Sequence, residues 1–289
     1  MSAIWMLLFK ISLAIFMAGS LLEMGLRLSL PDALRGLRSV RFVTYTLVWS
    51  FIICPALAYA ITRVIPLEPT YAIGLILLGM APCAPFVPIL VDKAKGDLGF
   101  TAAFMLLASA GTVICMPFTV PLLAKGLTTS AWAIAKPLLM VVLLPMAVGV
   151  VIRRYADALA LKLLPFAKKG AGIAGLVWTL LCLIIYGKGL LSMAGSFAVA
   201  SQFMFFGIVC IGTYWLGLGL RHEQRIVLSV GVTTRNLGAC LTPLLFAPDV
   251  DEQATLMIVL ALPIMVIVTL LCTKWFCRGA VASAVGGAA

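Results

Sequence analysis

The chain has 289 residues, of which 63% are hydrophobic and 11% charged, and its formal net charge is +11. A soluble domain carries about 25% charged residues, so this composition excludes a soluble globular protein. It indicates a polytopic membrane protein built as one domain over residues 1–289, in which polar residues fill only short loops.

Nine apolar runs are each long enough to span a bilayer as a helix, which takes about 20 residues. We expect no cleaved signal peptide, because no basic residue precedes the first run and Lys10 interrupts it. In chain order the predicted spans are 4–26, 42–62, 70–91, 98–123, 131–152, 171–191, 197–220, 226–246 and 254–275.

The basic residues predict how these spans are oriented. Most of the 21 Lys and Arg residues fall in alternate loops, and the positive-inside rule places such loops in the cytoplasm. We therefore expect a multi-pass protein of the cell membrane, plasma or bacterial inner, with its N-terminus outside and its C-terminus in the cytoplasm. The lipid bilayer accounts for the positive charge, so no nucleic-acid partner is expected.

The third and eighth runs each contain a segment that breaks a helix. Three prolines fall within seven residues of the third run (Pro82, Pro85 and Pro88), and each lacks a backbone donor. The eighth run contains Thr-Thr-Arg-Asn-Leu-Gly at 233–238, which is poor in helix formers. Unwound backbone at membrane depth is tolerated only against protein or a wet cavity, and a pair of interrupted helices is typical of a transporter binding site.

The order of the runs predicts an internal repeat. The first four runs superpose on the last four, and this leaves the fifth without a counterpart. The first run enters from outside and the sixth, its counterpart, from inside. We predict an all-α inverted repeat of five plus five helices that lacks the first of the ten.

Arg235 is an ionisable residue near the middle of the eighth run, where a cation costs at least a few kcal/mol. It either binds an anion directly or acts as a built-in cation in place of a bound ion; the alternative is a structural charge that satisfies exposed carbonyls. For Asn236, the alternative to a binding role is a structural hydrogen bond. The candidate substrate-binding residues are Arg235, Asn236, Thr233, Thr234, Cys83, Ala84 and Pro85.

No Asp or Glu lies in the middle of any run, so a carboxylate-based proton relay is not expected. The sequence also contains no metal-ligand cluster and no Ser-His-Asp set, and it calls for no cofactor. These features favour a transporter for a small-molecule organic anion over an enzyme. A membrane-embedded enzyme or receptor that uses the same cavity stays the alternative.

Several segments resemble motifs of the bile acid:sodium symporter family, over most of the chain. In chain order the segments are Met24-Gly25-Leu26-Arg27-Leu28, Cys54-Pro55-Ala56-Leu57-Ala58, Ala81-Pro82-Cys83-Ala84 with Ala94-Lys95-Gly96-Asp97, and Arg235-Asn236-Leu237-Gly238. The first resembles the Gly-Leu end of an early helix and the second a Met-Pro-Leu motif. The third and fourth resemble the frames of two broken helices. The resemblance implies a core domain (about 42–123 and 197–275), a panel domain (about 4–26 and 131–191), a hydrophobic substrate cavity between them, and alternating access.

The chain departs from this family at the expected sodium ligands. Gly231 stands where the family has a glutamate, and Arg235 stands where it has a glutamine. Ser50 takes the place of a further glutamine, whereas Thr101 keeps a hydroxyl. The ion-site candidates are therefore Thr101 and Ser50. Val87 and Pro88 replace the family's Ser-Asn pair.

Exchanging a carboxylate for a guanidinium shifts the local charge by about two units, as two bound sodium ions would. Our hypothesis is a sodium-independent secondary active transporter in which Arg235 stands in for bound sodium. Sodium coupling stays open as an alternative.

Overall fold

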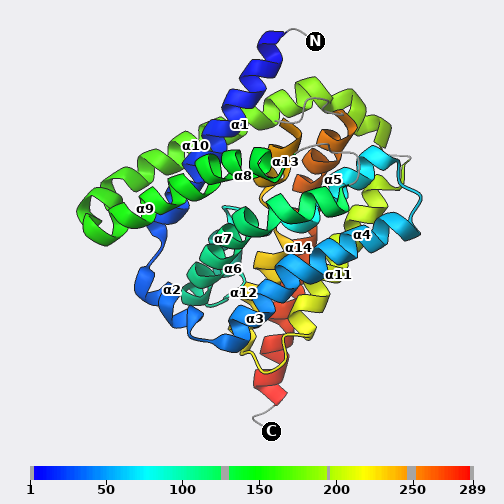
Figure 1. Ribbon diagram of the computed structural model, residues 1–289. Helices are drawn as coiled ribbons and strands as arrows, with labels where there is room; N and C mark the ends of the chain where they lie inside the picture. Colours follow the sequence, from blue (N-terminus) through cyan, green and yellow to red (C-terminus); the bar gives the residue numbers. More distant parts are fainter. Residues whose placement is uncertain (1–2, 125–129, 194–195, 246–251, 287–289) are drawn as a thin grey trace.

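The computed structural model describes residues 3–124, 130–193, 196–245 and 252–286, and these are almost entirely helical (Figure 1). In chain order the elements are α1 (Ala3–Arg27), α2 (Leu30–Leu37), α3 (Val40–Val48), η1 (Trp49–Ile53), α4 (Cys54–Val64), α5 (Pro69–Met80), α6 (Val87–Lys93), α7 (Leu98–Leu123), α8 (Ala131–Leu138), η2 (Leu139–Leu143), α9 (Leu144–Tyr155), α10 (Asp157–Ser192), α11 (Phe197–Trp215), α12 (His222–Thr233), α13 (Leu237–Leu245) and α14 (Glu252–Gly286).

Seven helical stretches of the described residues are long and apolar enough to cross a membrane, which confirms a multi-pass membrane protein. They are Ile4–Arg27, Val40–Val64, Leu98–Leu123, Ala131–Tyr155, Asp157–Leu190, Phe197–Trp215 and Gln253–Phe276. The other two predicted spans are the interrupted ones, now divided into α5 with α6 and α12 with α13. Each half is too short to span alone, and the total of nine spans stays a prediction.

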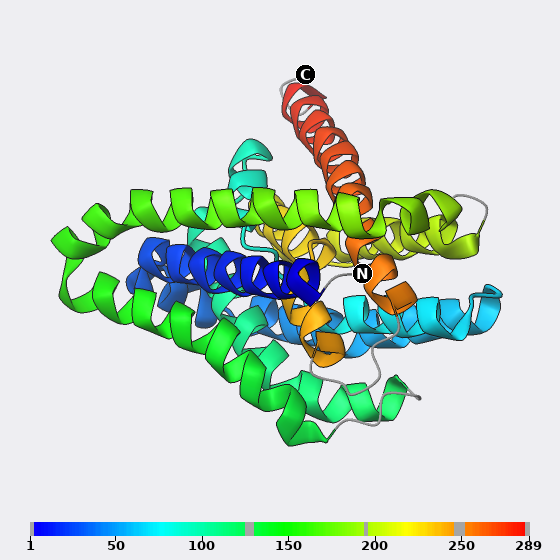
Figure 2. The same cartoon turned by 90° about the horizontal axis from the view of Figure 1, so that it is seen from above.

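Two groups of helices can be distinguished by their mutual contacts, although their buried side chains form one continuous hydrophobic core. In one, α1 lies between α9 and α10 and packs on both (Figure 2). In the other, α5 packs on α4 and α14, α11 packs on α12 and α14, and α7 packs on α2 and α3. The first group meets the second where α1 contacts α13 and α10 contacts α14.

Each of two spans contains one π-helical turn directly before a proline. η1 precedes Pro55 and η2 precedes Pro145, and in each case the N–H just before the proline bonds five residues back. A proline has no N–H and clashes with the preceding turn, and a π turn widens the helix at that point. The first of these turns sets the position of Cys54, which lies in the candidate site.

The segment 94–97 is a helix stop followed by a helix start. Lys95 takes a positive φ of 59°, and the N–H groups of Lys95 and Gly96 bond carbonyls of the last turn of α6, which is the Schellman arrangement. The Asp97 carboxylate then accepts from Gly99 (2.9 Å) and Phe100 (3.1 Å) at the start of α7. This segment therefore fixes α6 against α7.

The prediction that a loop joins the fifth and sixth spans was wrong, because most of this segment is helical. Residues 157–170 are helical and extend α10 to 36 residues, so Lys162, Lys168 and Lys169 lie on a helix rather than in a loop. This segment is rich in Ala, Leu and Lys, which are strong helix formers. A second predicted loop contains α2, whose second residue is Pro31. Proline favours the first turn of a helix.

The crossing of α1 and α9 gives a stability test. A Cβ atom at Gly25 would meet the carbonyl oxygen of Met146, and one at Gly149 would lie 2.6 Å from the carbonyl oxygen of Leu22. Because backbone cannot move aside as a side chain can, we expect Gly25→Ala to lower stability by about 1–3 kcal/mol, measured as the melting temperature in detergent.

The matched control is Gly170→Ala on α10, where an added Cβ meets no atom within 4 Å. It should leave the melting temperature unchanged or slightly higher, because alanine favours a helix over glycine. Equal melting temperatures for the two variants would contradict the close backbone crossing.

Candidate functional site

The two interrupted helices meet at their breaks, where Pro82 and Arg235 form an antiparallel β-bridge. The Cys83 N–H donates to the Thr234 carbonyl over 2.8 Å, and the Asn236 N–H donates to the Ala81 carbonyl over 3.0 Å. Each break thus supplies hydrogen-bond partners for backbone N–H and carbonyl groups of the other. This pairing satisfies part of the backbone that the two breaks release, as burial at membrane depth requires.

The bridge imposes an unusual backbone conformation on Cys83. Its φ is +76°, in the left-handed region that residues other than glycine rarely adopt. The side chain is buried, and its sulfur lies 4.0 Å from the Ala84 carbonyl oxygen. Cys83 and Ala84 therefore shape the bend, and direct contact of either with a substrate stays a prediction.

Asn236 caps the second half of its interrupted helix. Its Oδ1 accepts from the Ala239 N–H (3.2 Å) and its carbonyl accepts from the Cys240 N–H (3.0 Å), which is the N-cap pattern for α13. The side chain is 7% exposed and lines a cavity. The oxygen of Asn236 is therefore structural, and because the residue also lines the cavity, a binding role stays a prediction.

The Arg235 guanidinium is fully buried, with 0% of the residue exposed. Nη2 donates to Cys54 Sγ on α4 (3.0 Å), and Nη1 donates to the Gly79 carbonyl on α5 (3.4 Å). The guanidinium carbon also lies 5.2 Å from the centre of the Phe205 ring on α11, a cation–π distance. The side chain thus ties together three helices of one packing group.

No carboxylate among the described residues pairs with Arg235. Its charge is instead met in part by the end of α5, whose Gly79 carbonyl accepts from Nη1 and which ends at Met80. A helix C-terminus carries roughly half a negative charge, so it offsets part of this cation. The guanidinium thus occupies the kind of place where an unwound helix binds a cation.

A cavity of about 260 Å³ adjoins the crossing. Its walls come from α1 and α10 on one side, and from the two breaks and α14 on the other. Pro85, Arg235, Asn236 and Gly238 belong to the crossing, and Trp178 belongs to α10. The cavity is therefore bordered by both packing groups and by the N-terminus of α13, whose partial positive charge favours anions.

The other predicted site residues lie outside this cavity. Thr234 bonds backward to the Val230 carbonyl (2.9 Å), and Thr233 is fully buried with no hydrogen-bond partner for its hydroxyl among the described residues. Ser50 lies in η1 with its hydroxyl likewise unpartnered there. Thr101 bonds the Asp97 carbonyl (2.8 Å). Roles in substrate or ion binding for these four stay predictions.

Thr101 lines a second cavity, of about 320 Å³, between the end of α1, the start of α7, and α9 with α10. This cavity is mostly apolar and contains Arg27 and Arg153. Both arginines have acidic partners, Glu23 at 2.8 Å and Asp157 at 2.5 Å. The structure therefore does not bring Thr101 to the cavity that adjoins the crossing.

Several residues at the site were missed by the sequence analysis. Phe205 and the Gly79 carbonyl contact Arg235, and Phe16, Phe86 and Trp178 line the cavity. Each is an apolar residue or a backbone group in an apolar span, so nothing in its type distinguishes it from a residue that faces lipid. Only Cys54 was already part of a recognised motif.

Two residues that line the cavity have a buried side-chain nitrogen without a hydrogen-bond partner among the described residues, namely Trp178 (Nε1) and Arg235 (Nε). A buried tryptophan N–H usually finds a partner, and an unsatisfied donor costs about 1–3 kcal/mol.

The family model "Sodium Bile acid symporter family" matches residues 14–193, more than half of the chain. The chain belongs to this family. The match includes α5 and α6 but ends before α12 and α13, so it covers one of the two interrupted helices.

Among curated relatives of this symporter family, the chain is 31% identical over 140 residues to the probable sodium/metabolite cotransporter BASS1, chloroplastic, of Arabidopsis thaliana, covering 47% of this chain and 34% of that protein. It is 26% identical over 242 residues to BASS2, chloroplastic, of Oryza sativa subsp. japonica, covering 81% and 56%. The chain thus spans about half the length of such relatives or less. The names of the family and of these relatives describe transporters, not enzymes.

The positive φ of Cys83 gives a test of the bend. Replacing cysteine by glycine removes a buried side chain at either Cys83 or Cys240, but only at Cys83 does glycine also relieve a left-handed backbone. Left-handed geometry costs an ordinary residue about 1–2 kcal/mol. We expect both variants to lower the free energy of unfolding. The loss for Cys83→Gly should be smaller than the loss for Cys240→Gly by at least about 1 kcal/mol.

Cys240 is the matched control because it is buried within α13, where glycine is unfavourable by about 1 kcal/mol. The measurement is thermal or denaturant unfolding in detergent. If Cys83→Gly proved the more damaging of the two, the left-handed bend would not be the conformation of this segment.

Proposed function

We propose that this protein is a secondary transporter that carries a small or amphipathic organic anion by alternating access, without sodium coupling. The observation that carries the proposal is the buried guanidinium of Arg235, held by the end of α5 and facing no carboxylate among the described residues. The adjoining cavity borders the N-terminus of α13, which favours an anionic ligand.

The proposed architecture divides the chain into a panel domain of α1 and α8 to α10 and a core domain of α3 to α7 and α11 to α14. The packing of α1 on α9 and α10, apart from the group around α5 and α11, supports this division for those three helices, whereas α8 packs on α7 and α13. The nine spans then form an inverted repeat, with the N-terminus outside a cell membrane and the C-terminus in the cytoplasm. Of the basic residues behind this orientation, Lys125 lies outside the described residues.

Arg235 bears on coupling because a second cation would meet strong repulsion. Two unit charges 4 Å apart repel by about 4 kcal/mol at an effective dielectric constant of 20, which corresponds to roughly a thousandfold in affinity. A sodium ion at the same helix end would also have to displace Nη1 from the Gly79 carbonyl. A permanent cation therefore supports transport that needs no sodium.

The packing around Gly231 fits the same proposal. The resemblance places a sodium-binding glutamate at this position, but a Cβ atom on Gly231 would lie 2.5 Å from Cε1 of the Phe104 ring. The ring is fully buried and already occupies the space that any side chain would need. Relative to the family pattern, this chain lacks the glutamate at position 231 and has Arg235 instead of a glutamine. The Phe104 ring fills the space of the missing glutamate, and Arg235 supplies positive charge in place of an ion.

The test of the function compares uptake into proteoliposomes in sodium and in choline medium, with a mixture of radiolabelled organic anions. We expect equal uptake in the two media for the natural protein. Arg235→Gln should lose at least tenfold in choline, because the end of α5 then lacks its cation, and added sodium should restore part of the loss.

Arg235→Lys is the control that keeps the charge but loses the two-point contact with Cys54 and Gly79. It should transport more slowly than the natural protein and remain indifferent to sodium. A steep sodium requirement in the natural protein that persists in Arg235→Gln would contradict the proposal.

A further inference from the structure

Two cavities adjoin beside the turn that joins α9 to α10. One, of about 320 Å³, lies between the end of α1, the start of α7, and α9 with α10; the other, of about 300 Å³, lies between the α1–α2 junction and the α9–α10 turn. Leu28 and Arg153 line both. No residue that lines the crossing cavity lines either of them, so they form a separate site.

The two cavities differ in polarity. Apart from Arg27, Thr101 and Arg153, every residue that lines the larger cavity is apolar. The smaller cavity is lined by Arg153, Arg154 and Asp157 together with residues of the α1–α2 junction. Its two arginines and one carboxylate leave one excess positive charge. The site as a whole is therefore amphipathic, with a basic part beside an apolar part.

Arg154 is the cation of this site that lacks a carboxylate partner among the described residues. It is exposed, and its guanidinium carbon lies 5.9 Å from the centre of the Tyr155 ring. Arg153 pairs with Asp157 through Nη1, but a guanidinium carries five N–H donors. Its planar fork matches the oxygens of a phosphate group. The smaller cavity therefore offers donors and charge to a phosphate.

The helix ends place the basic part at the level of lipid headgroups. With 36 residues at 1.5 Å each, α10 is about 54 Å long, whereas the hydrocarbon core is about 30 Å thick. Its first turns contain the exposed residues Lys162, Lys168 and Lys169, so this is the part that extends beyond the core. Tyr155 is 83% exposed at the same turn, and tyrosine is enriched at membrane interfaces.

We propose that the two adjoining cavities bind an anionic phospholipid, with its phosphate between Arg153 and Arg154 and an acyl chain in the larger cavity. The orientation proposed above places this lipid in the cytoplasmic leaflet, where basic pockets between helices bind anionic headgroups. The apolar part of the site favours a lipid over a free anion. The inference goes beyond the proposed function, and its readout is binding rather than transport.

A lipid in this position would contact both packing groups. Met24 of α1 and Leu161 of α10 line the larger cavity on one side, and Leu98 and Met105 of α7 line it on the other. A ligand that binds the folded state raises its stability by mass action. The bound lipid should therefore stabilise the packing of α1 and α10 against α7, and raise the melting temperature.

The experiment uses the full chain in an uncharged detergent at about 0.15 M salt, where exposed charges are screened beyond about 8 Å. The probes are dioleoyl phosphatidylglycerol, dioleoyl phosphatidylcholine and glycerol 3-phosphate, and bound copies are counted by native mass spectrometry. We expect phosphatidylglycerol to bind about tenfold or more tightly than either other probe, because one lacks the net negative charge and the other lacks acyl chains.

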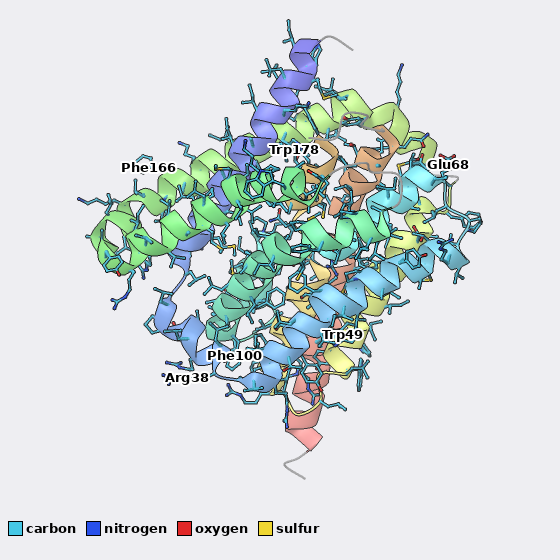
Figure 3. The ribbon with its side chains drawn as sticks, viewed as in Figure 1. Arg38, Trp49, Glu68, Phe100, Phe166 and Trp178 are labelled. Carbon is cyan, nitrogen blue, oxygen red and sulfur yellow. The ribbon has the colours of Figure 1, made fainter. Side chains whose placement is uncertain are left out.

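Arg154→Gln tests the headgroup contact, and Arg38→Gln is the matched control. Both variants remove one exposed arginine that has no ion pair among the described residues, but Arg38 lines neither cavity. Figure 3 shows Arg38 where α2 leads into α3, apart from the α9–α10 turn. Arg154→Gln should raise the Kd for phosphatidylglycerol about fivefold, and Arg38→Gln less than about twofold.

A second pair of variants tests whether an acyl chain occupies the larger cavity. Ala102 and Ala110 are both half-buried on α7, but only Ala102 lines the cavity. Ala102→Phe should weaken binding of phosphatidylglycerol about fivefold or more, since each methylene displaced from an apolar site loses about 0.8 kcal/mol. Ala110→Phe should leave it unchanged. Equal melting temperatures of the two variants without lipid exclude a folding defect.

Three results would each overturn the lipid site. Equal binding of phosphatidylcholine and phosphatidylglycerol would show that the arginines do not select charge. Equal binding of glycerol 3-phosphate and the lipid would reveal a site for free phosphate instead. Equal Kd values for Arg154→Gln and Arg38→Gln would place the headgroup elsewhere. None of these results depends on uptake, so the transport proposal stands or fails separately.

Discussion

The structure depends on one requirement, that the backbone groups released by two broken helices find partners in a medium without water. The bridge between Pro82 and Arg235 meets it, with one hydrogen bond on each side from Cys83 and Asn236. Because each break satisfies the other, neither could persist alone at membrane depth. The crossing in turn fixes where α5 and α12 end and where α13 begins, and so where their partial charges lie.

Arg235 follows from this placement. The negative end of α5 favours a cation, and the guanidinium bonds the last turn of this helix while it rests on the Phe205 ring. Its backbone takes part in the bridge while its side chain extends into the core, so one residue links the crossing to α4 through Cys54. The π turn before Pro55 sets the position of this cysteine, which gives the Cys54-Pro55 motif a physical role.

The sequence predicted the features that polar and helix-breaking residues encode. The breaks near Pro82 and Arg235 and the multi-pass fold both appear in the structure. It did not predict that α10 begins at Asp157, because Ala, Leu and Lys suit both a helix and the end of a span. Nor did it predict that Phe205 contacts Arg235 or that Trp178 lines the cavity, since an apolar residue that faces lipid and one that lines a cavity look alike in sequence.

The difference between a bound ion and a side-chain cation lies in what each can exchange with the solution. A bound sodium ion enters from one side and leaves on the other, so its gradient can drive the cycle. A guanidinium attached to the backbone and 0% exposed cannot leave, so it neutralises the end of α5 without drawing on any gradient. Under the proposed function, energy for net movement must come from the anion itself, through its own gradient and the membrane potential, which acts on each charge by about 2.3 kcal/mol per 100 mV. A carrier of this kind gains selectivity only from contacts with the anion, which makes the hydrogen bonds of the cavity walls the part of the molecule that decides what is carried.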